Sequence, residues 1–214
     1  MIKIHLINLL LKIYKYINIK MLAKEAILSR RSCRKYQTKD VPKEILEDII
    51  LAGRSAPTAM NRQEIKFYVI ANDIKKVQSI DEKVMENRAK AGKAGGWIED
   101  YQKKYDMKNV IFYDAPCIIA LVADKNENER EQYWHHMDAG IVTSNILTMA
   151  NSYGLGTVPI GIANFLNQEA VLEGVGADKE KEHLLLVIAL GYPVEGYKEK
   201  YVHEKPLTSF VKYC

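Results

Sequence analysis

The sequence predicts a single domain that mixes helices with strands, of the α+β or the α/β class. Its 214 residues are enough for one ordinary domain with a sizeable buried core. Short runs rich in β-branched and aromatic residues are interspersed with longer segments of helical periodicity. The sequence contains no internal repeat and no low-complexity linker, so we expect all the elements to build one core.

The first predicted elements are a helix and a strand. The helix lies in VPKEILEDIILAGRSAP, residues 41–57, where Pro42 suits a first helical turn, acidic residues occupy the early turns and Pro57 ends the element. Next, IKFYVIA at 65–71 predicts a strand, because β-branched and aromatic residues dominate it. The charged segment from about 73 to 108 is predicted to be mostly helical, with breaks at its glycines.

The second half begins with an unbroken apolar run, PCIIALVAD at 116–124, which predicts a strand buried on both faces. Residues 132–153 predict a long helix. One stripe of small or apolar residues runs along it: Met137, Ile141, Ser144, Leu147 and Thr148. A short strand near 157–160, a helix around 168–172 and a strand over 183–193 are predicted to follow.

The two ends of the chain depart from this pattern. Residues 194–214 have little core-forming pattern, so we expect them to lie on another surface, such as that of a partner subunit. Residues 1–20 are predicted to be an extension of a domain that spans 21–214. Three interpretations of the extension stay open: an amphipathic element packed on the domain or its dimer partner, the product of a translation start upstream of Met21, or a helix on a membrane surface.

Charge and cysteine content exclude several classes of function. The chain has 31 Lys and Arg against 27 Asp and Glu, and a net charge of +4 is too mild for a protein that mainly binds a nucleic-acid backbone. Cys33, Cys117 and Cys214 are widely spaced and form no CxxC pair, which argues against a structural zinc site and for reduced thiols. We therefore expect a cytoplasmic protein without nucleic-acid or membrane partners.

One short stretch is unusual in its charge. SRRSCRKY, residues 29–36, places Arg30, Arg31, Arg34 and Lys35 within six residues. Because four cations so close together repel one another, they predict an anionic partner. Nucleic acid, an acidic lipid surface and the phosphate of a small cofactor are the three possibilities.

The glycine string GLGTVPIG, residues 154–161, does not predict a dinucleotide-binding site. That site needs a strand, a glycine turn and a helix in this order, whereas here a long helix precedes the glycines and a strand follows. Gly154 is predicted to end the helix with a positive φ. Pro159 and Gly161 fall where the strand ends, in a plain turn or at a place where a flat ligand approaches the backbone.

Aromatic and histidine residues allow structural as well as functional interpretations. His135 and His136 are adjacent on a helix and point to different faces, so they are not predicted to hold one metal. Trp97, Tyr101 and Tyr105 share helical spacing, and form either part of the core or the wall of a pocket for a planar ligand.

The loop APTAMNRQE, residues 56–64, is also ambiguous. Its side-chain amides, Asn61 and Gln63, can donate and accept hydrogen bonds at once, which suits the edge of a heteroaromatic ring. An ordinary capping loop has the same composition. The chain has neither a GxxxxGK[ST] phosphate loop nor a GxSxG nucleophile turn.

Four stretches in order and spacing resemble the nitroreductase family of FMN-dependent oxidoreductases. They are SRRSCRKY, VPKEILEDIILAGRSAPTAMNRQ, DAGIVTSNILTMANSYGLGTVPIG and IALGYP. No single stretch is specific, but four in register are, and the resemblance covers roughly 29–210. It implies an α+β, nitroreductase-like fold, with a central, mostly antiparallel sheet flanked by helices, in an intertwined homodimer with FMN at the subunit interface.

The resemblance also implies the site residues. The basic stretch would hold the FMN phosphate and the ring edge, the loop after the first helix would come from the other subunit, and the end of the short strand would back the ring. The implied cofactor-binding residues are Arg30, Arg31, Ser32, Arg34, Pro57, Thr58, Ala59, Asn61, Gln63, Pro159, Ile160, Gly161 and Lys205. Trp97 and Tyr101 are expected to line the substrate pocket.

Several positions depart from the family pattern. Gln63 is followed by Glu64 and Ile65, where the family often has Pro-Trp, and Thr58 replaces the commoner serine. Glu204 stands where the family usually has a phosphate-contacting arginine, which makes the adjacent Lys205 the substitute candidate.

The implied reaction is a ping-pong oxidoreduction. NADH or NADPH would reduce the flavin, and a flat acceptor such as a nitroaromatic or a quinone would then take the electrons. Because the flavin carries out the redox chemistry, no protein catalytic residue and no metal site are predicted. Two alternatives stay open: a non-catalytic protein that stores or senses FMN, and a membrane- or nucleic-acid-associated module led by the basic stretch and the extension.

Overall fold

The protein is described here by a computed structural model that covers residues 23–87, 96–199, 206 and 209–212. Within these residues a four-stranded sheet runs in the order β1-β2-β4-β3, and every neighbouring pair is antiparallel. The strands are β1 (Lys66–Ile70), β2 (Cys117–Asp124), β3 (Gly156–Ile160) and β4 (Glu182–Gly191). All four predicted strands are confirmed to within two residues, and the antiparallel pairing makes the fold α+β.

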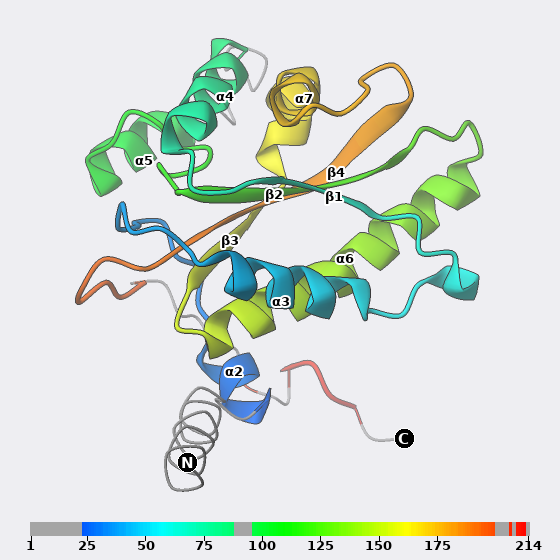
Figure 1. The fold of residues 1–214 in the computed structure, drawn as a ribbon, viewed down its shortest axis with the longest axis horizontal. Coiled ribbons are helices and arrows are strands. Elements are labelled where there is room, and N and C mark those ends of the chain that lie inside the picture. The colour runs from blue at the N-terminus through cyan, green and yellow to red at the C-terminus, as the bar shows by residue number, and fades with distance from the viewer. Residues whose placement is uncertain (1–22, 88–95, 200–205, 207–208, 213–214) are drawn as a thin grey trace, which may run out of the picture.

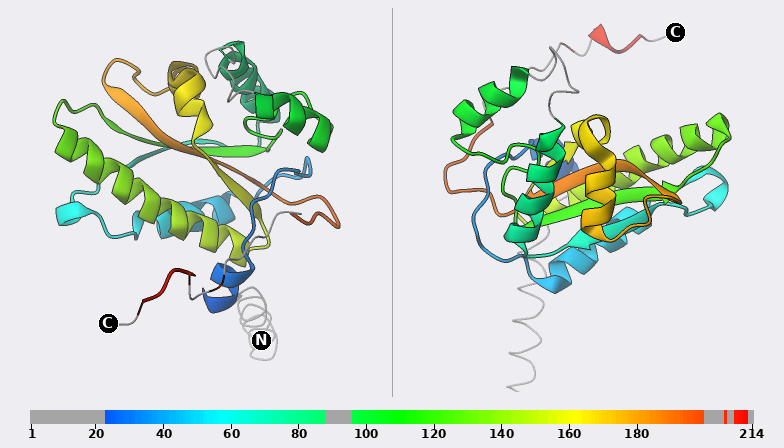
Figure 2. Two further views of the ribbon diagram at one scale, coloured as in Figure 1. Left: turned by 180° about the vertical axis from the view of Figure 1, so that it is seen from behind. Right: turned by 90° about the horizontal axis from the view of Figure 1, so that it is seen from above.

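Helices cover both faces of the sheet (Figures 1 and 2). On one face α3 packs against the long α6, and on the other α4 packs against α7, with α5 beside α4. The short α2 packs against α6. The bounds are α2 (Ala23–Ser29), α3 (Lys43–Arg54), α4 (Ile74–Glu86), α5 (Trp97–Tyr105), α6 (Glu129–Ser152) and α7 (Ile162–Val175).

Strand β2 is buried on both faces, as its unbroken apolar run predicted. Ile118, Ala120 and Val122 belong to the core on the α4 and α7 side. Ile119 and Leu121, which alternate with them, belong to the core on the α3 and α6 side. The two layers of helices therefore share one central strand.

The stripe of small or apolar residues noted on α6 is mostly not the buried face of the helix. Met137 is 41% exposed and Ser144 is exposed, while Leu147 is buried. The α6 residues that the core buries are His135, Asp138, Ala139, Val142, Thr143, Ile146, Leu147 and Ala150. Close packing selects this face, because a Cβ added to Gly53 of α3 would stand 2.9 Å from the Cγ1 atom of Ile146.

Helix ends differ from the predictions where a cap decides them. Helix α6 begins at Glu129, three residues before the predicted start, because the Asn128 side chain accepts a hydrogen bond from the Arg130 N–H at 3.0 Å. Helix α7 begins at Ile162, well before the predicted 168, and contains a non-helical residue at Asn167. Gly154 follows α6 with φ +73°, which confirms its predicted positive φ.

Some predictions concern residues that the structure does not describe. Residues 1–20, with their three interpretations, and the pair Glu204 and Lys205 lie outside the described ranges. Among the helices that are described, none combines the length and the apolar character needed to cross a membrane.

Candidate functional site

The basic stretch lies alongside β3, although more than 120 residues separate the two in the sequence. Ser32 forms a parallel bridge with Thr157, and the Cys33 N–H donates to the Thr157 carbonyl at 2.9 Å. A Cβ on Gly156 would lie 2.5 Å from the Cβ of Cys33, so only glycine permits this approach. The glycine string therefore serves to place the basic stretch against the sheet.

The basic stretch opens onto a cavity of about 310 Å³. Four of the predicted cofactor residues line it, together with the predicted substrate-pocket residue Tyr101 and with Lys104 and Glu199. The lining residues are Arg30, Arg31, Ser32, Arg34, Tyr101, Lys104 and Glu199. The cavity thus brings together cations, a hydroxyl and an aromatic ring that the sequence places on separate elements, and this donor set suits a phosphate with an attached ring.

Arg34 is already paired inside this cavity. Its Nη1 atom lies 2.6 Å from Oε2 of Glu199, and its guanidinium carbon lies 5.9 and 5.8 Å from the ring centres of Tyr101 and Tyr113. Lys104 Nζ lies 3.7 Å from the other oxygen of Glu199. Arg31 also lines the cavity, but its Nη1 atom donates to the Leu28 and Arg30 carbonyls at 2.7 and 2.8 Å.

The Glu199 carboxylate is ionised despite its burial. Burial alone would raise its pKa, but the Tyr197 hydroxyl, which donates to Oε2 at 3.0 Å, and the neighbouring Arg34 and Lys104 outweigh burial and lower that pKa. The cavity therefore contains a permanent negative charge that the sequence did not lead us to expect.

Glu199 belongs to a strap of residues 192–199 that lies on the basic stretch of the same chain. The Val194 N–H donates to the Lys35 carbonyl at 3.2 Å, and the Arg34 N–H donates to the Tyr197 hydroxyl at 3.2 Å. For this part of the tail, the other surface on which it was expected to lie belongs to the same chain. Sequence reasoning missed Tyr197 and Glu199 because nothing in a polar tail marks two residues as partners of an arginine 163 and 165 positions away.

The loop with the second group of predicted residues is held by its own side chains and by α6. The Ala59 N–H donates to Asp138 at 3.0 Å, the Thr58 hydroxyl accepts from the Gln63 N–H at 3.1 Å, and the Gln63 amide donates to Asn61 at 3.0 Å. Asn61 and Gln63 have φ of 57° and 55° and so occupy the left-handed region of backbone conformation. Met60, which precedes them, occupies the same region. Several non-glycine residues in this region mark a strained loop, a feature that concentrates at binding sites.

The two groups of predicted cofactor residues lie at opposite ends of α6 (Figure 1). The loop is bound to α6 at Asp138, whereas Ser29, beside the basic stretch, accepts a hydrogen bond from Asn151 at 2.9 Å. Thirteen residues of helix span about 20 Å. Within one protomer the α6 anchors of the two groups are therefore about 20 Å apart.

Strand β3 has two features that contacts within the protomer do not explain, one near its start and one just after its end. The Thr157 hydroxyl is buried and has no hydrogen-bond partner among the described residues. A Cβ on Gly161 would meet only the Cδ1 atom of Leu186, at an ordinary 3.9 Å, so packing within this chain does not require glycine there. Pro159 is exposed and Ile160 is buried. A glycine that packing does not require fits a ligand that approaches the backbone at the strand end.

The aromatic residues of α5 divide between the two predicted roles, part of the core and the wall of a cavity. Tyr105 is buried in the core, whereas Tyr101 lines the cavity and packs edge-on against both Tyr105 and Trp97, with ring centres 5.4 and 5.2 Å apart. Trp97 is half-buried and does not reach the cavity wall.

One histidine of the pair at 135 and 136 contacts Glu64, the acidic residue that follows Gln63 in the loop. His135 is buried with its Nε2 atom 3.3 Å from Glu64, while His136 is exposed, so the two face different sides as predicted. Among the described residues, no group of three His, Cys, Asp or Glu could hold a metal ion.

A family model matches most of the chain. The model described as "Nitroreductase family" matches residues 27–192. A Methanothermobacter thermautotrophicus protein, described provisionally as an NADH dehydrogenase/NAD(P)H nitroreductase, is 30% identical over 176 residues, which cover 82% of this chain and 80% of that protein.

Other relatives are described differently. The "Iodotyrosine dehalogenase 1 homolog" of Caenorhabditis elegans is 24% identical over 199 residues, 88% of this chain and 60% of that protein, so this chain spans less than two thirds of its length. Among solved structures, a nitroreductase from Bacteroides fragilis with bound FMN has a TM-score of 0.72 at 23% identity, covering 90% of this chain and all of that one.

Proposed function

The chain belongs to the nitroreductase family, and on that premise we propose that it is an FMN-dependent oxidoreductase that passes electrons from NADH or NADPH to a flat acceptor. The observation that carries the proposal is the cavity in which Arg30, Arg31 and Ser32 face Tyr101 beside β3. It supports a phosphate-bearing, planar cofactor, because it offers guanidinium and hydroxyl donors at one place and an aromatic wall at another. The proposed acceptor is a nitroaromatic or a quinone.

The chain's own residues fit FMN in three ways. Arg30 and Arg31 supply the positive charge that a phosphate dianion needs. Gly161 has no side chain to hinder a ring at the strand end, and Thr157 offers a buried hydroxyl without a partner in the described chain. When bound, FMN would supply the ring that accepts and returns electrons. The protein would bind it, orient it and limit the approach of water.

The active unit in this proposal is a homodimer. Since about 20 Å of α6 separates the loop at 57–63 from the basic stretch, a complete site needs the loop of a second copy. The exposed side of α6, with Met137 and Ser144, offers a surface on which a two-fold related α6 could pack and place each loop at the partner's cavity. The stripe of small and apolar residues predicted from sequence would then be interface.

A cytosolic location is also proposed. Within the described ranges, Cys33 and Cys117 are both buried free thiols, which suits a reducing compartment.

The test is a spectrum of the purified protein followed by anaerobic addition of NADH. Oxidised flavin bands at roughly 370 and 450 nm that bleach with NADH would support a reducible flavoprotein. Oxidation of NADH that continues when an acceptor is added separates an enzyme from a protein that only stores FMN. A colourless protein that also fails to bind added FMN would refute the proposal.

A double substitution tests whether the arginines that line the cavity hold the FMN phosphate. Arg30→Ala with Arg34→Ala should release FMN while leaving a folded dimer, as measured by flavin absorbance after gel filtration. Retention of the full flavin content by this variant would show that other residues hold the phosphate.

A further inference from the structure

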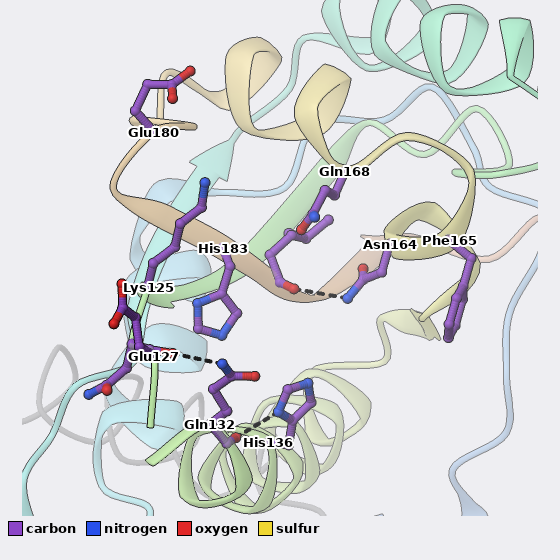
Figure 3. A pocket seen from close by; sticks show the side chains of 11 residues that line it. Lys125, Glu127, Gln132, His136, Asn164, Phe165, Gln168, Glu180 and His183 are labelled. Carbon is purple, nitrogen blue, oxygen red and sulfur yellow. Dashed lines mark hydrogen bonds between the residues drawn. The ribbon is translucent and has the colours of Figure 1, made fainter. Parts of the chain in front are cut away.

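A second cavity, of about 770 Å³, lies at the open end of β4 and contains none of the predicted cofactor residues (Figure 3). Strand β3 pairs with β4 only as far as Val187, so the first residues of β4 have no β3 partner on this edge. Helices α6 and α7 and the loop after β2 wall the hollow. Its volume suits a small molecule.

Side-chain donors around this cavity are turned toward backbone carbonyls. Asn164 Nδ2 donates to the Leu184 and Leu185 carbonyls, both at 2.9 Å, and Gln132 Nε2 donates to the Asn126 carbonyl at 2.7 Å (Figure 3). Lys125 Nζ donates to the Lys179 carbonyl at 2.7 Å. These contacts satisfy the ends of strands and loops, and they remove donors from the cavity.

The two histidines that line the cavity, His136 and His183, also use a ring N–H on a backbone group and not on the cavity. His136 Nδ1 lies 2.7 Å from the Gln132 carbonyl, and since a carbonyl only accepts, Nδ1 carries the hydrogen and its donor is used within α6. His183 donates to the Asp124 backbone, and its Nε2 atom has no partner among the described residues. Its pKa is lowered by burial and by the neighbouring His135 and His136, so the ring is neutral at pH 7.

The remaining polar groups are therefore mostly acceptors. The Asn164 Oδ1 atom, like His183 Nε2, has no partner in the described structure. The formal charges of the lining are the carboxylates of Glu127 and Glu180 against the single ammonium of Lys125, so the wall is negative overall. A ligand that brings N–H donors and positive charge would satisfy this wall, and an anion would not.

An exposed aromatic ring adds a specific surface for such a ligand. Phe165, in the first turn of α7, is 81% exposed and belongs to the lining. A cation over the face of an exposed phenyl ring gains a favourable electrostatic interaction, and an apolar ligand body packs on the same ring.

We propose that this cavity binds a small organic ammonium ion with an apolar or aromatic body. The ammonium group faces the acceptor wall between α6 and the open end of β4, and the body lies on Phe165. This cavity and the proposed FMN cavity have no lining residue in common.

The test uses the purified full chain and three probes of one shape: benzylammonium, benzyl alcohol and benzoate, measured by titration calorimetry. Benzylammonium should bind at least fivefold more tightly than the other two. Phe165→Ala should weaken it two- to fivefold, as should Glu127→Gln combined with Glu180→Gln. Because these side chains are exposed, the variants should fold normally. Phe210→Ala, which removes a ring exposed elsewhere, is the matched control and should change nothing.

Two results would overturn the inference. One is binding of benzoate or benzyl alcohol as tight as that of benzylammonium, or no measurable binding of benzylammonium at millimolar concentration. The other is unchanged affinity in both lining variants. A protein that binds FMN but not benzylammonium would sink this inference alone, while the reverse result would sink only the proposed function.

Discussion

Glu199→Gln should make the protein bind FMN more tightly. Glu199 places a buried negative charge in the wall of the cavity, 2.6 Å from Arg34, where a phosphate dianion is proposed to bind. A cavity of about 310 Å³ is roughly 8 Å across, so a unit charge on its wall acts on one inside with about 2 kcal/mol at an effective dielectric constant of about 20. Screening by salt reduces this to about 1 kcal/mol, which corresponds to a fivefold change in affinity.

The assay is a fluorescence titration of FMN into flavin-free protein at low and at high salt. The gain in affinity should shrink at high salt, because it is electrostatic. Glutamine keeps the shape and a hydrogen-bond acceptor for Arg34, so the free energy of unfolding should fall by only about 1–2 kcal/mol. Tighter binding by a less stable protein separates a charge effect from general damage.

The matched control is Glu173→Gln, which removes the same charge from α7. Glu173 pairs with Lys179 at 2.6 Å on the surface and does not line the cavity. It should leave FMN affinity unchanged. Weaker FMN binding by Glu199→Gln would refute the reasoning and show that Glu199 serves mainly to orient Arg34. An equal gain in the control would show that net charge alone is responsible.

Two further predictions concern packing and pH. Gly156→Ala should lower the free energy of unfolding by about 1–3 kcal/mol and weaken FMN binding, because its Cβ would displace Cys33 and the basic stretch. Thermal melts and FMN titration measure the two effects. Gly96→Ala is the control, because a Cβ there would meet nothing within 4 Å. Asp81→Asn should flatten the pH dependence of stability. Burial raises the pKa of Asp81 to about 7 although the Phe112 N–H donates to it at 2.6 Å, so its contribution is fully present below about pH 4 and is lost as pH rises through 7. A rise of about three in the pKa corresponds to about 4 kcal/mol, so the variant should gain about that much relative to the wild type at pH 8 in denaturant titrations. A slope between pH 4 and 7 that is the same in the variant and the wild type would contradict this assignment.

Local sequence determined the strands and most of the helices. The run at 116–124 could only be a strand covered on both sides, because an element with no polar face must be buried. The basic stretch was recognisable as a local concentration of positive charge, because the arginine and lysine side chains alone place it there. Gly154 was assigned correctly because the left-handed end of a helix is a local requirement.

Only the tertiary structure decided which face of α6 is buried and which residues meet Arg34. The apolar pattern of α6 continues around the helix, so α3 and the sheet, through contacts such as Gly53 with Ile146, chose the face. The partner of Arg34 is a glutamate on a strap whose polar sequence carries no periodic signal. Periodicity records which side chains avoid water within one element, whereas an ion pair between distant segments depends on how the chain returns, and that return is fixed by the packing of the whole domain.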